Sequence, residues 1–343
     1  MGCLPSRLLV DLPNWLGDLV HALPALQAML RANRGGETTL VLPSAHLPLA
    51  GALAVQVVAR PPGAGWSWAR RALRGRFDVA LTARHSTRAK TLLAGVRAPL
   101  RLASAGRGAF CLGLRTFAVC RRRHQRHDLD EALAHLGLPP VGDAPVQLSL
   151  APACRLRGRR DVADLAGGRG AAILCPGVRH RPAKRYPAER FVAVGRALRG
   201  AGWAVLVAGG PGEEPLLAAV AAGCGGVVVP AGWALDRIAG VLGASEVAVG
   251  NDSGLTHLAA AVGCPTVVLH GPTDPLRTGA AGRVRTLVAP EPGGLAALCP
   301  HRVAWVARAA AAGEGLHVPR EDAMIPFGGG PLAQLAEQGT LNP

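Results

Sequence analysis

The feature that most constrains the fold of this sequence is the alternation, in its second half, of short apolar runs with longer amphipathic segments. Runs that are apolar almost throughout are typical of strands buried on both faces of a parallel sheet. We expect such strands at residues 171–174, 204–208, 227–229, 246–249 and 266–269. The segments between them predict helices at residues 188–199, 213–221, 235–242 and 254–262. The first and the last of these helices end at a glycine, which is a typical helix stop.

The first half of the chain repeats this pattern less clearly. We expect strands at residues 7–12, 38–42 and 77–81, and helices before Leu30 and at residues 128–136. Two such halves predict an α/β protein with two Rossmann-like, doubly wound parallel-sheet domains that face each other across a cleft. We expect an N-terminal domain at residues 1–150 and a second domain at residues 171–290. Residues 151–170 would be a linker with a short helix at most, and residues 291–343 would be an atypical C-terminal tail.

Composition limits the classes of function. A chain that is 49% hydrophobic and 17% charged is not mostly disordered. The formal charge of +16 would attract nucleic acid, an anionic membrane surface or a phosphorylated substrate. We recognise no nucleic-acid-binding motif, and aromatic residues are only 3% of the chain, so an anionic substrate or lipid is favoured. Eight cysteines without a CxxC pair suit the reduced thiols of a cytosolic protein.

The turn in "GNDSGLTHLAAAVGCPTVVLHGPTDP", at residues 250–275, is the strongest candidate for a ligand site. A helix that begins near Ser253 or Gly254 leaves its first N–H groups without helical partners, at the positive end of its dipole. Such a helix end binds anions such as phosphate, and His257 could add a further hydrogen bond. A simple helix cap formed by Asp252 or Ser253 explains the same residues without a ligand.

Three other turns carry candidate residues. In "CPGVRHRPAKRYPAERF", Lys184 is one of only two lysines among 38 basic residues, and its compact charge suits a diphosphate. In "LPNWLGDLVHALPALQAML", Asp18 follows a strand and could act as a general base. In "AGGPGEEPLLAAV", Glu213 or Glu214 could hold the diol of a ribose. Each turn has an explanation without a ligand. Lys184 could belong to a solvated basic loop, and Asp18 and the two glutamates could simply stabilise the starts of helices.

In order and spacing, these turns resemble those of glycosyltransferase family 9, the ADP-heptose:lipopolysaccharide heptosyltransferases. The segments "HSTRAKTLLAG" and "HQRHDLDEALAHLGLP" resemble the family too, and "PNWLGDLVHALPAL" and "PAKRYP" favour its heptosyltransferase II branch. The resemblance covers about residues 7–282. It implies a GT-B architecture, with the acceptor on the first domain and the sugar nucleotide mainly on the second. It also implies an inverting transfer that has no obligatory bound metal and no cofactor.

Carried over by position, the resemblance makes Asp18 the general base and Lys184 the group that neutralises the leaving diphosphate. It assigns the ribose to one of the two glutamates, and we favour Glu214. The ADP phosphates or the heptose would be cradled by Asp252, Ser253, Gly254, Leu255 and Thr256, with His257 assisting. Basic segments of the first domain could meet an anionic lipopolysaccharide core, through Arg84, Ser86 and Arg88. The implied location is the cytoplasmic face of the inner membrane, with no nucleic acid as partner.

The chain departs from the family pattern in two places. Leu102 and Ala103 stand where a glycine and a tyrosine are common, and the ending "GPLAQLAEQGTLNP" is one that a frameshift would explain. Three alternatives stay open at this point. They are a family member with another donor or acceptor, a basic nucleic-acid- or membrane-binding protein without catalysis, and a nicotinamide-dependent oxidoreductase. The last lacks a G-x-G-x-x-G turn after the first strand.

Overall fold

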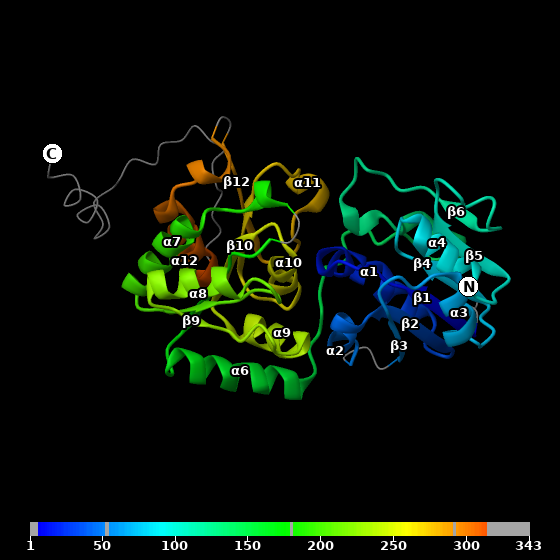
Figure 1. The fold of residues 1–343 in the computed structure, drawn as a ribbon, viewed down its shortest axis with the longest axis horizontal. Helices are drawn as coiled ribbons and strands as arrows, with labels where there is room; N and C mark the ends of the chain where they lie inside the picture. Colours follow the sequence, from blue (N-terminus) through cyan, green and yellow to red (C-terminus); the bar gives the residue numbers. More distant parts are fainter. Residues whose placement is uncertain (1–5, 52–54, 179–180, 291–292, 314–343) are drawn as a thin grey trace, which may run out of the picture.

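The computed structural model describes residues 6–51, 55–178, 181–290 and 293–313, which form two α/β lobes (Figure 1). Each lobe is built on a sheet of six parallel strands. Parallel strands need crossover connections, and the helices that make these crossovers cover both faces of each sheet. The carboxyl ends of all strands in one sheet therefore lie along one edge, where ligands bind in such folds.

The first lobe holds residues 7–135 on a sheet of strand order β3-β2-β1-β4-β5-β6. These strands are β1 Arg7–Asp11, β2 Glu37–Pro43, β3 Gln56–Arg60, β4 Val79–Thr82, β5 Leu100–Ser104 and β6 Arg115–Phe117. The helices are α1 Leu16–Ala32, α2 Leu47–Ala50, α3 Trp66–Ala72, α4 Thr87–Ala94 and α5 Asp130–His135. Alternate residues of β1 face opposite sides, so that Leu8 packs in the cluster with α1 and Leu9 in the cluster with α3 and α4.

The second lobe has the order β12-β11-β10-β7-β8-β9, which repeats the arrangement of the first. Its strands are β7 Ala171–Cys175, β8 Ala204–Val207, β9 Val227–Val228, β10 Val247–Asn251, β11 Thr266–His270 and β12 Val284–Val288. Its helices are α7 Ala188–Gly200, α8 Glu214–Cys224, α9 Leu235–Ala244, α10 Gly254–Ala261, α11 Pro275–Thr278 and α12 Pro300–Ala312. In both lobes the order reverses next to the first strand, as in a doubly wound sheet. The predicted fold class is confirmed.

The segment between the lobes differs from the expected linker. Residues 152–166 form α6, a helix of 15 residues (Pro152–Ala166) that packs on α9 where a short helix at most was expected. Its buried side is marked by small or apolar residues four positions apart, at Cys154, Gly158, Val162 and Ala166. Gly158 lies so close to the backbone of Gly240 that an added Cβ would overlap it.

Part of the expected tail also belongs to the fold. The helix α12 packs on α7 and against β10 and β11, and its residues Val303, Val306 and Ala307 are wholly buried in the core of the second lobe. The expectation that the pattern ends at Pro290 is therefore wrong for residues 300–312. Residues 314–343, which include the ending that a frameshift would explain, lie outside the described part of the chain.

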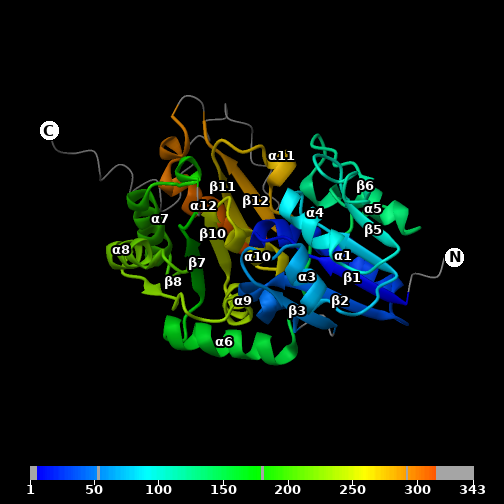
Figure 2. The same ribbon diagram turned by 45° about the vertical axis from the view of Figure 1, so that its right-hand side comes forward.

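The lobes contact each other through the first turns of α1 and α10 (Figure 2). A Cβ added to Gly254 would lie 2.8 Å from the Cβ of Leu16, and one added to Gly17 would lie 3.3 Å from His257 Cδ2. The rings of His21 and His257 meet edge to face at 4.7 Å. One hydrophobic cluster continues from α1 into α10. Within the described residues, no helix has the length and hydropathy to cross a membrane.

Candidate functional site

A connected group of polar side chains in the second lobe is centred on Asp252, directly after β10. Its Oδ2 accepts hydrogen bonds from Lys184 Nζ at 2.6 Å and from Thr273 Oγ1 at 2.8 Å. Its Oδ1 lies 3.0 Å from His257 Nε2, and His270 Nδ1 lies 3.9 Å from Oδ2. We call these five residues the Asp252 cluster. Lys184 and the residue before Ser253 are thus in direct contact, although 68 positions separate them in the sequence.

The electrostatics of the cluster favour an ionised aspartate. Burial by itself would raise the pKa of Asp252, but hydrogen bonds from His257 and Lys184 outweigh burial and hold the pKa well below its ordinary value. Burial lowers the pKa of His270, and the charge of Asp252 opposes this only in part. The side chain of Asp252 is 2% exposed, whereas that of Lys184 is 15% exposed. The ammonium is therefore the charge of this pair that a ligand can reach.

A buried asparagine holds Lys184 in this position. Asn251 Nδ2 donates to the carbonyl of Pro176 at 2.8 Å, and Asn251 Oδ1 accepts from the backbone N–H of Tyr186 at 2.9 Å. The Tyr186 hydroxyl donates to Leu298 O at 2.8 Å. The short helix η3 (Pro182–Lys184) is thereby fixed at the carboxyl edge of the sheet. Asn251 was not predicted as a site residue, although it directly precedes Asp252.

The first turn of α10 has the form that its sequence predicted. Ser253 is the N-cap residue, with φ −142° and ψ 164°, and its side chain makes no capping hydrogen bond to the helix. Ser253, Gly254 and Leu255 are half-buried. Thr256 is wholly buried and donates to Asn251 O at 2.7 Å, so its hydroxyl holds the turn. His257 is also buried, and it contacts the carboxylate of Asp252.

The two glutamates at the start of α8 lie differently. Glu213 Oε2 accepts from the backbone N–H of Gly210 at 2.8 Å. A Cβ at Gly177 would collide with the same carboxylate, so Glu213 lies over the end of β7. Glu214 is fully exposed, and backbone N–H groups of its own turn lower its pKa. The structure therefore turns Glu213, and not the favoured Glu214, towards the carboxyl edge.

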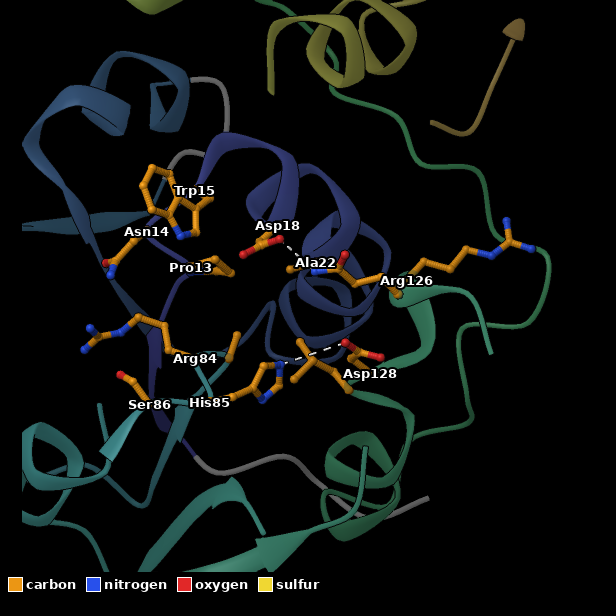
Figure 3. A pocket seen from close by; sticks show the side chains of 13 residues that line it. Pro13, Asn14, Trp15, Asp18, Ala22, Arg84, His85, Ser86, Arg126 and Asp128 are labelled. Carbon is orange, nitrogen blue, oxygen red and sulfur yellow. Dashed lines mark hydrogen bonds and ion pairs between the residues drawn. The ribbon is translucent and has the colours of Figure 1, made fainter. Parts of the chain in front are cut away.

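The first lobe contains a separate pocket next to the start of α1 (Figure 3). Asp18 lies on one side of it, and Arg84, His85 and Ser86 lie on the other. Asp18 Oδ1 accepts a hydrogen bond from Gln125 Nε2 at 2.8 Å. The remaining lining residues are Pro13, Asn14, Trp15, Ala22, Ala83, Arg126, Asp128 and Leu129.

The three expected acceptor residues do not share one role. Arg84 is buried, and its guanidinium contacts Asp11 at 2.8 Å, beside the second ion pair that Asp11 makes with Arg60. Ser86 is exposed and caps α4 by accepting from Ala89 N at 3.3 Å. Arg88 is exposed and is not among the residues that line the pocket. Within the described residues, no three His, Cys, Asp or Glu side chains are placed to hold a metal ion.

Comparison with known proteins gives one family. Residues 66–292 match the family described as glycosyltransferase family 9 (heptosyltransferase). Lipooligosaccharide heptosyltransferase 2 of Haemophilus influenzae is 30% identical over 155 residues, which are 41% of this chain and 44% of that protein. Lipopolysaccharide heptosyltransferase 2 of Escherichia coli is 33% identical over 120 residues, which are 33% of this chain and 34% of that protein. The chain thus matches less than half the length of these curated relatives.

Solved structures extend the likeness over nearly the whole fold. A glycosyl transferase family 9 protein from Veillonella parvula superposes with a TM-score of 0.80 at 18% identity, covering 91% of this chain and 99% of that one. The E. coli ADP-heptose lps heptosyltransferase II superposes with a TM-score of 0.77 at 20% identity, covering 90% and 99%. At these identities the likeness shows the fold, which is the GT-B architecture that the resemblance implied.

Proposed function

This chain belongs to glycosyltransferase family 9, and from that premise we propose that it transfers a heptose from ADP-heptose to the inner core of lipopolysaccharide. The observation that carries the proposal is the direct contact of Lys184 with Asp252 beside the start of α10. This contact places a reachable ammonium next to the free N–H groups of a helix N-terminus, which together suit a diphosphate. The names of the curated relatives supply the sugar and the acceptor class.

In the proposed reaction an acceptor hydroxyl displaces ADP from the anomeric carbon in one step. The new C–O bond forms as the bond to the diphosphate oxygen breaks, and the configuration at the anomeric carbon inverts. Asp18 takes the proton of the attacking hydroxyl. Negative charge grows on the leaving diphosphate, where Lys184 and the N–H groups of Ser253 and Gly254 stabilise it.

The donor would lie along the carboxyl edge of the second sheet. We propose that Glu213 binds the ribose hydroxyls, since its carboxylate lies over Gly177, whereas Glu214 faces solvent. Asp252 then acts by holding Lys184 and His257. The buried hydroxyl of Thr256 stabilises the turn through its hydrogen bond to Asn251 O, and Leu255 is a half-buried residue of the same turn.

The acceptor would enter the pocket of the first lobe beside Asp18. Arg126, which lines this pocket, supplies a positive charge for an anionic core sugar, whereas the Arg84 guanidinium is already paired with Asp11. The same carboxyl edge bears the loop after β5, in which Phe110 is 93% exposed and Arg107 is exposed too. We propose that this loop meets the cytoplasmic face of the inner membrane, where an aromatic ring and basic groups bind anionic lipid headgroups.

The proposal is tested by ADP release from ADP-heptose with lipopolysaccharide that lacks its core heptoses. We expect release that depends on both substrates, and a product whose new glycosidic bond has the configuration opposite to that of the donor. Release with ADP-glucose or a UDP-sugar, but not with ADP-heptose, would contradict the proposed donor. Sedimentation with vesicles that contain phosphatidylglycerol, weakened in Phe110→Ser, tests the membrane contact separately.

A further inference from the structure

The segment of residues 123–128 lies between the two lobes and belongs to neither sheet. It contains the short helix η2 (Gln125–His127), which packs against α1. One side of this segment holds the carboxylate of Asp18, through the hydrogen bond from Gln125. Gln125 lines the same pocket as Asp18, and it belongs to the segment "HQRHDLDEALAHLGLP", in which no site residue was predicted from the sequence.

The other side of the segment is held by the second lobe. Both terminal nitrogens of Arg277, on α11, donate to the carboxylate of Asp128 at 2.7 Å, and one of them also donates to Arg123 O at 2.8 Å. The His124 ring lies with Nε2 2.8 Å from Gly279 O and with Nδ1 3.2 Å from Arg126 N. Burial lowers the pKa of His124, and its neutral ring fits this pattern with Nε2 as donor and Nδ1 as acceptor.

The same part of the second lobe also touches the Asp252 cluster. Thr273, which donates to Asp252, stands four positions before Arg277, and the Asp274 side chain between them caps α11 by accepting from Leu276 N at 2.9 Å. A short, hydrogen-bonded segment thus reaches from Asp252 to Asp128. On the first lobe, Asp128 stands three positions after Gln125.

We propose that Gln125 is a positioning residue for the Asp18 carboxylate, and that the Arg277–Asp128 ion pair holds Gln125 in place from the opposite lobe. The inference rests on the proposed function, in which Asp18 takes the acceptor proton. A carboxylate with one neutral donor can rotate unless that donor is itself fixed. The ion pair fixes it only while the lobes are in contact, so the base is oriented when the second lobe is in place.

Charged groups around Asp18 matter for the test. His85 and Arg84 face the pocket from the turn after β4, and Arg126 and Asp128 face it from the η2 segment. His85 Nε2 lies 3.8 Å from Asp128 Oδ2, and burial lowers the pKa of His85. A variant at position 125 leaves all four of these groups unchanged.

The experiment measures kcat and KM for both substrates, with pH profiles, for Gln125→Ala, Gln125→Glu, Arg277→Gln and the double variant Gln125→Ala/Arg277→Gln. We expect Gln125→Ala to lower kcat about ten- to hundredfold, with the KM for ADP-heptose unchanged, because a misplaced base affects the chemical step alone. Gln125→Glu should move the acid limb of the kcat profile to higher pH, because neighbouring carboxylates resist joint ionisation. Arg277→Gln should lower kcat similarly, and the double variant should be no worse than Gln125→Ala alone.

Two matched controls separate positioning from folding. Gln27 is a glutamine on α1 that makes one hydrogen bond, to Gln147 O at 2.7 Å, away from the pocket, and Arg283 is exposed on the second lobe. Gln27→Ala and Arg283→Gln should leave kcat unchanged. Multiplicative losses in the double variant, or an acid limb that does not move in Gln125→Glu, would overturn the inference.

The proposed function fails separately, if the wild type releases no ADP from ADP-heptose. In that case, crystal structures of the wild type and of Gln125→Ala test the role of Gln125 without an activity measurement. An Asp18 carboxylate that changes its orientation in the variant supports the inference, and one that keeps its orientation contradicts it.

Discussion

The two polar sites of this molecule are built in different ways. In the second lobe the Asp252 carboxylate has close contacts from Lys184, Thr273 and His257, all from its own lobe, and it is almost wholly buried. In the first lobe Asp18 lines an open pocket, and the hydrogen bond to Gln125 comes from a segment that the second lobe holds. The comparison teaches that the proposed diphosphate site is held within one lobe, whereas the side chain proposed as the base is held through a contact between the lobes.

The largest effect is expected at Asp18. Asp18→Asn removes the base but keeps its size, and it should lower kcat about 10³-fold, within the range for general base catalysis. ADP affinity, measured by calorimetry, should stay within twofold because the proposed diphosphate site lies in the other lobe. Asp164→Asn, at an exposed position on α6, is the control. Equal losses of turnover and ADP affinity in Asp18→Asn would contradict the assignment of the base and the diphosphate to separate lobes.

The next effect is expected at Lys184. Lys184→Ala should weaken ADP binding about 30-fold or more and lower turnover as well, because the same ammonium meets the bound and the leaving diphosphate. Stability should also fall by about 2 kcal/mol, since Asp252 loses a charged hydrogen-bond donor. Urea unfolding measures this loss. Lys184→Arg keeps the charge but not the compact ammonium, so intermediate ADP affinity is expected; full ADP affinity in Lys184→Ala would refute the assignment.

A smaller effect is expected where the lobes touch. The added methyl of Gly254→Ala would lie 2.8 Å from the Cβ of Leu16, so it should move the first turns of α1 and α10 apart. We expect kcat to fall about tenfold, or about 1.4 kcal/mol in activation free energy. Gly35→Ala, which meets no atom within 4 Å, should be neutral. Unchanged kcat in Gly254→Ala would show that close contact between the lobes is not needed.

The smallest effect concerns the stability of the first lobe in acid. Burial, with a smaller contribution from Arg60, lowers the pKa of His46 in the first lobe to about 4, and its Nδ1 has no hydrogen-bond partner. The unfolded chain binds this proton below about pH 6.5, so stability falls as pH drops from 6.5 towards 4. Burial also lowers the pKa of His270 in the second lobe, but the charge of Asp252 opposes this shift.

His46→Gln should therefore remove about 1 kcal/mol of the stability loss between pH 7.5 and pH 5.5. Urea unfolding at the two pH values measures it, with His135→Gln as the control. An identical pH dependence in wild type and His46→Gln would contradict this origin of the acid sensitivity.

Much of the fold could be predicted from the sequence because its central strands are apolar on both faces. The expected strands at residues 7–12 and 266–269 correspond to β1 and β11 within one residue at each end. The missed strands β3, β5, β6 and β12 lie towards the sheet edges and carry arginine or glutamine among their apolar residues. Edge strands are partly exposed, so the continuous apolar pattern is absent there.

Two of the helices that were missed or underestimated, α6 and α12, have a different cause. In α6 four of the buried residues recur every fourth position, but arginines at positions 155, 157, 159 and 160 stand among them, and the segment was therefore taken for a linker. In α12 the buried Val303, Val306 and Ala307 follow helical spacing, so a signal was present in a segment that was interpreted as part of the tail.

The candidate sites show where prediction from sequence ends. Residues within one turn, such as Asp252 and Ser253, could be found because parallel strands bring their following turns to one edge. Gln125 and Asp18 are 107 positions apart, and Arg277 and Asp128 are 149 apart. Nothing local in the sequence indicates these pairs, since each depends on how the two lobes meet. The choice between Glu213 and Glu214 also required the structure, because both start the same helix.

A crystal structure of the protein with an unreactive ADP-heptose analogue tests the central claim most directly. The account predicts the diphosphate within hydrogen-bond distance of Lys184 Nζ and of the backbone N–H groups at the start of α10. It also predicts the anomeric carbon between this site and the Asp18 carboxylate. A diphosphate bound in the first-lobe pocket beside Arg84, with Lys184 still paired only to Asp252, would contradict the account.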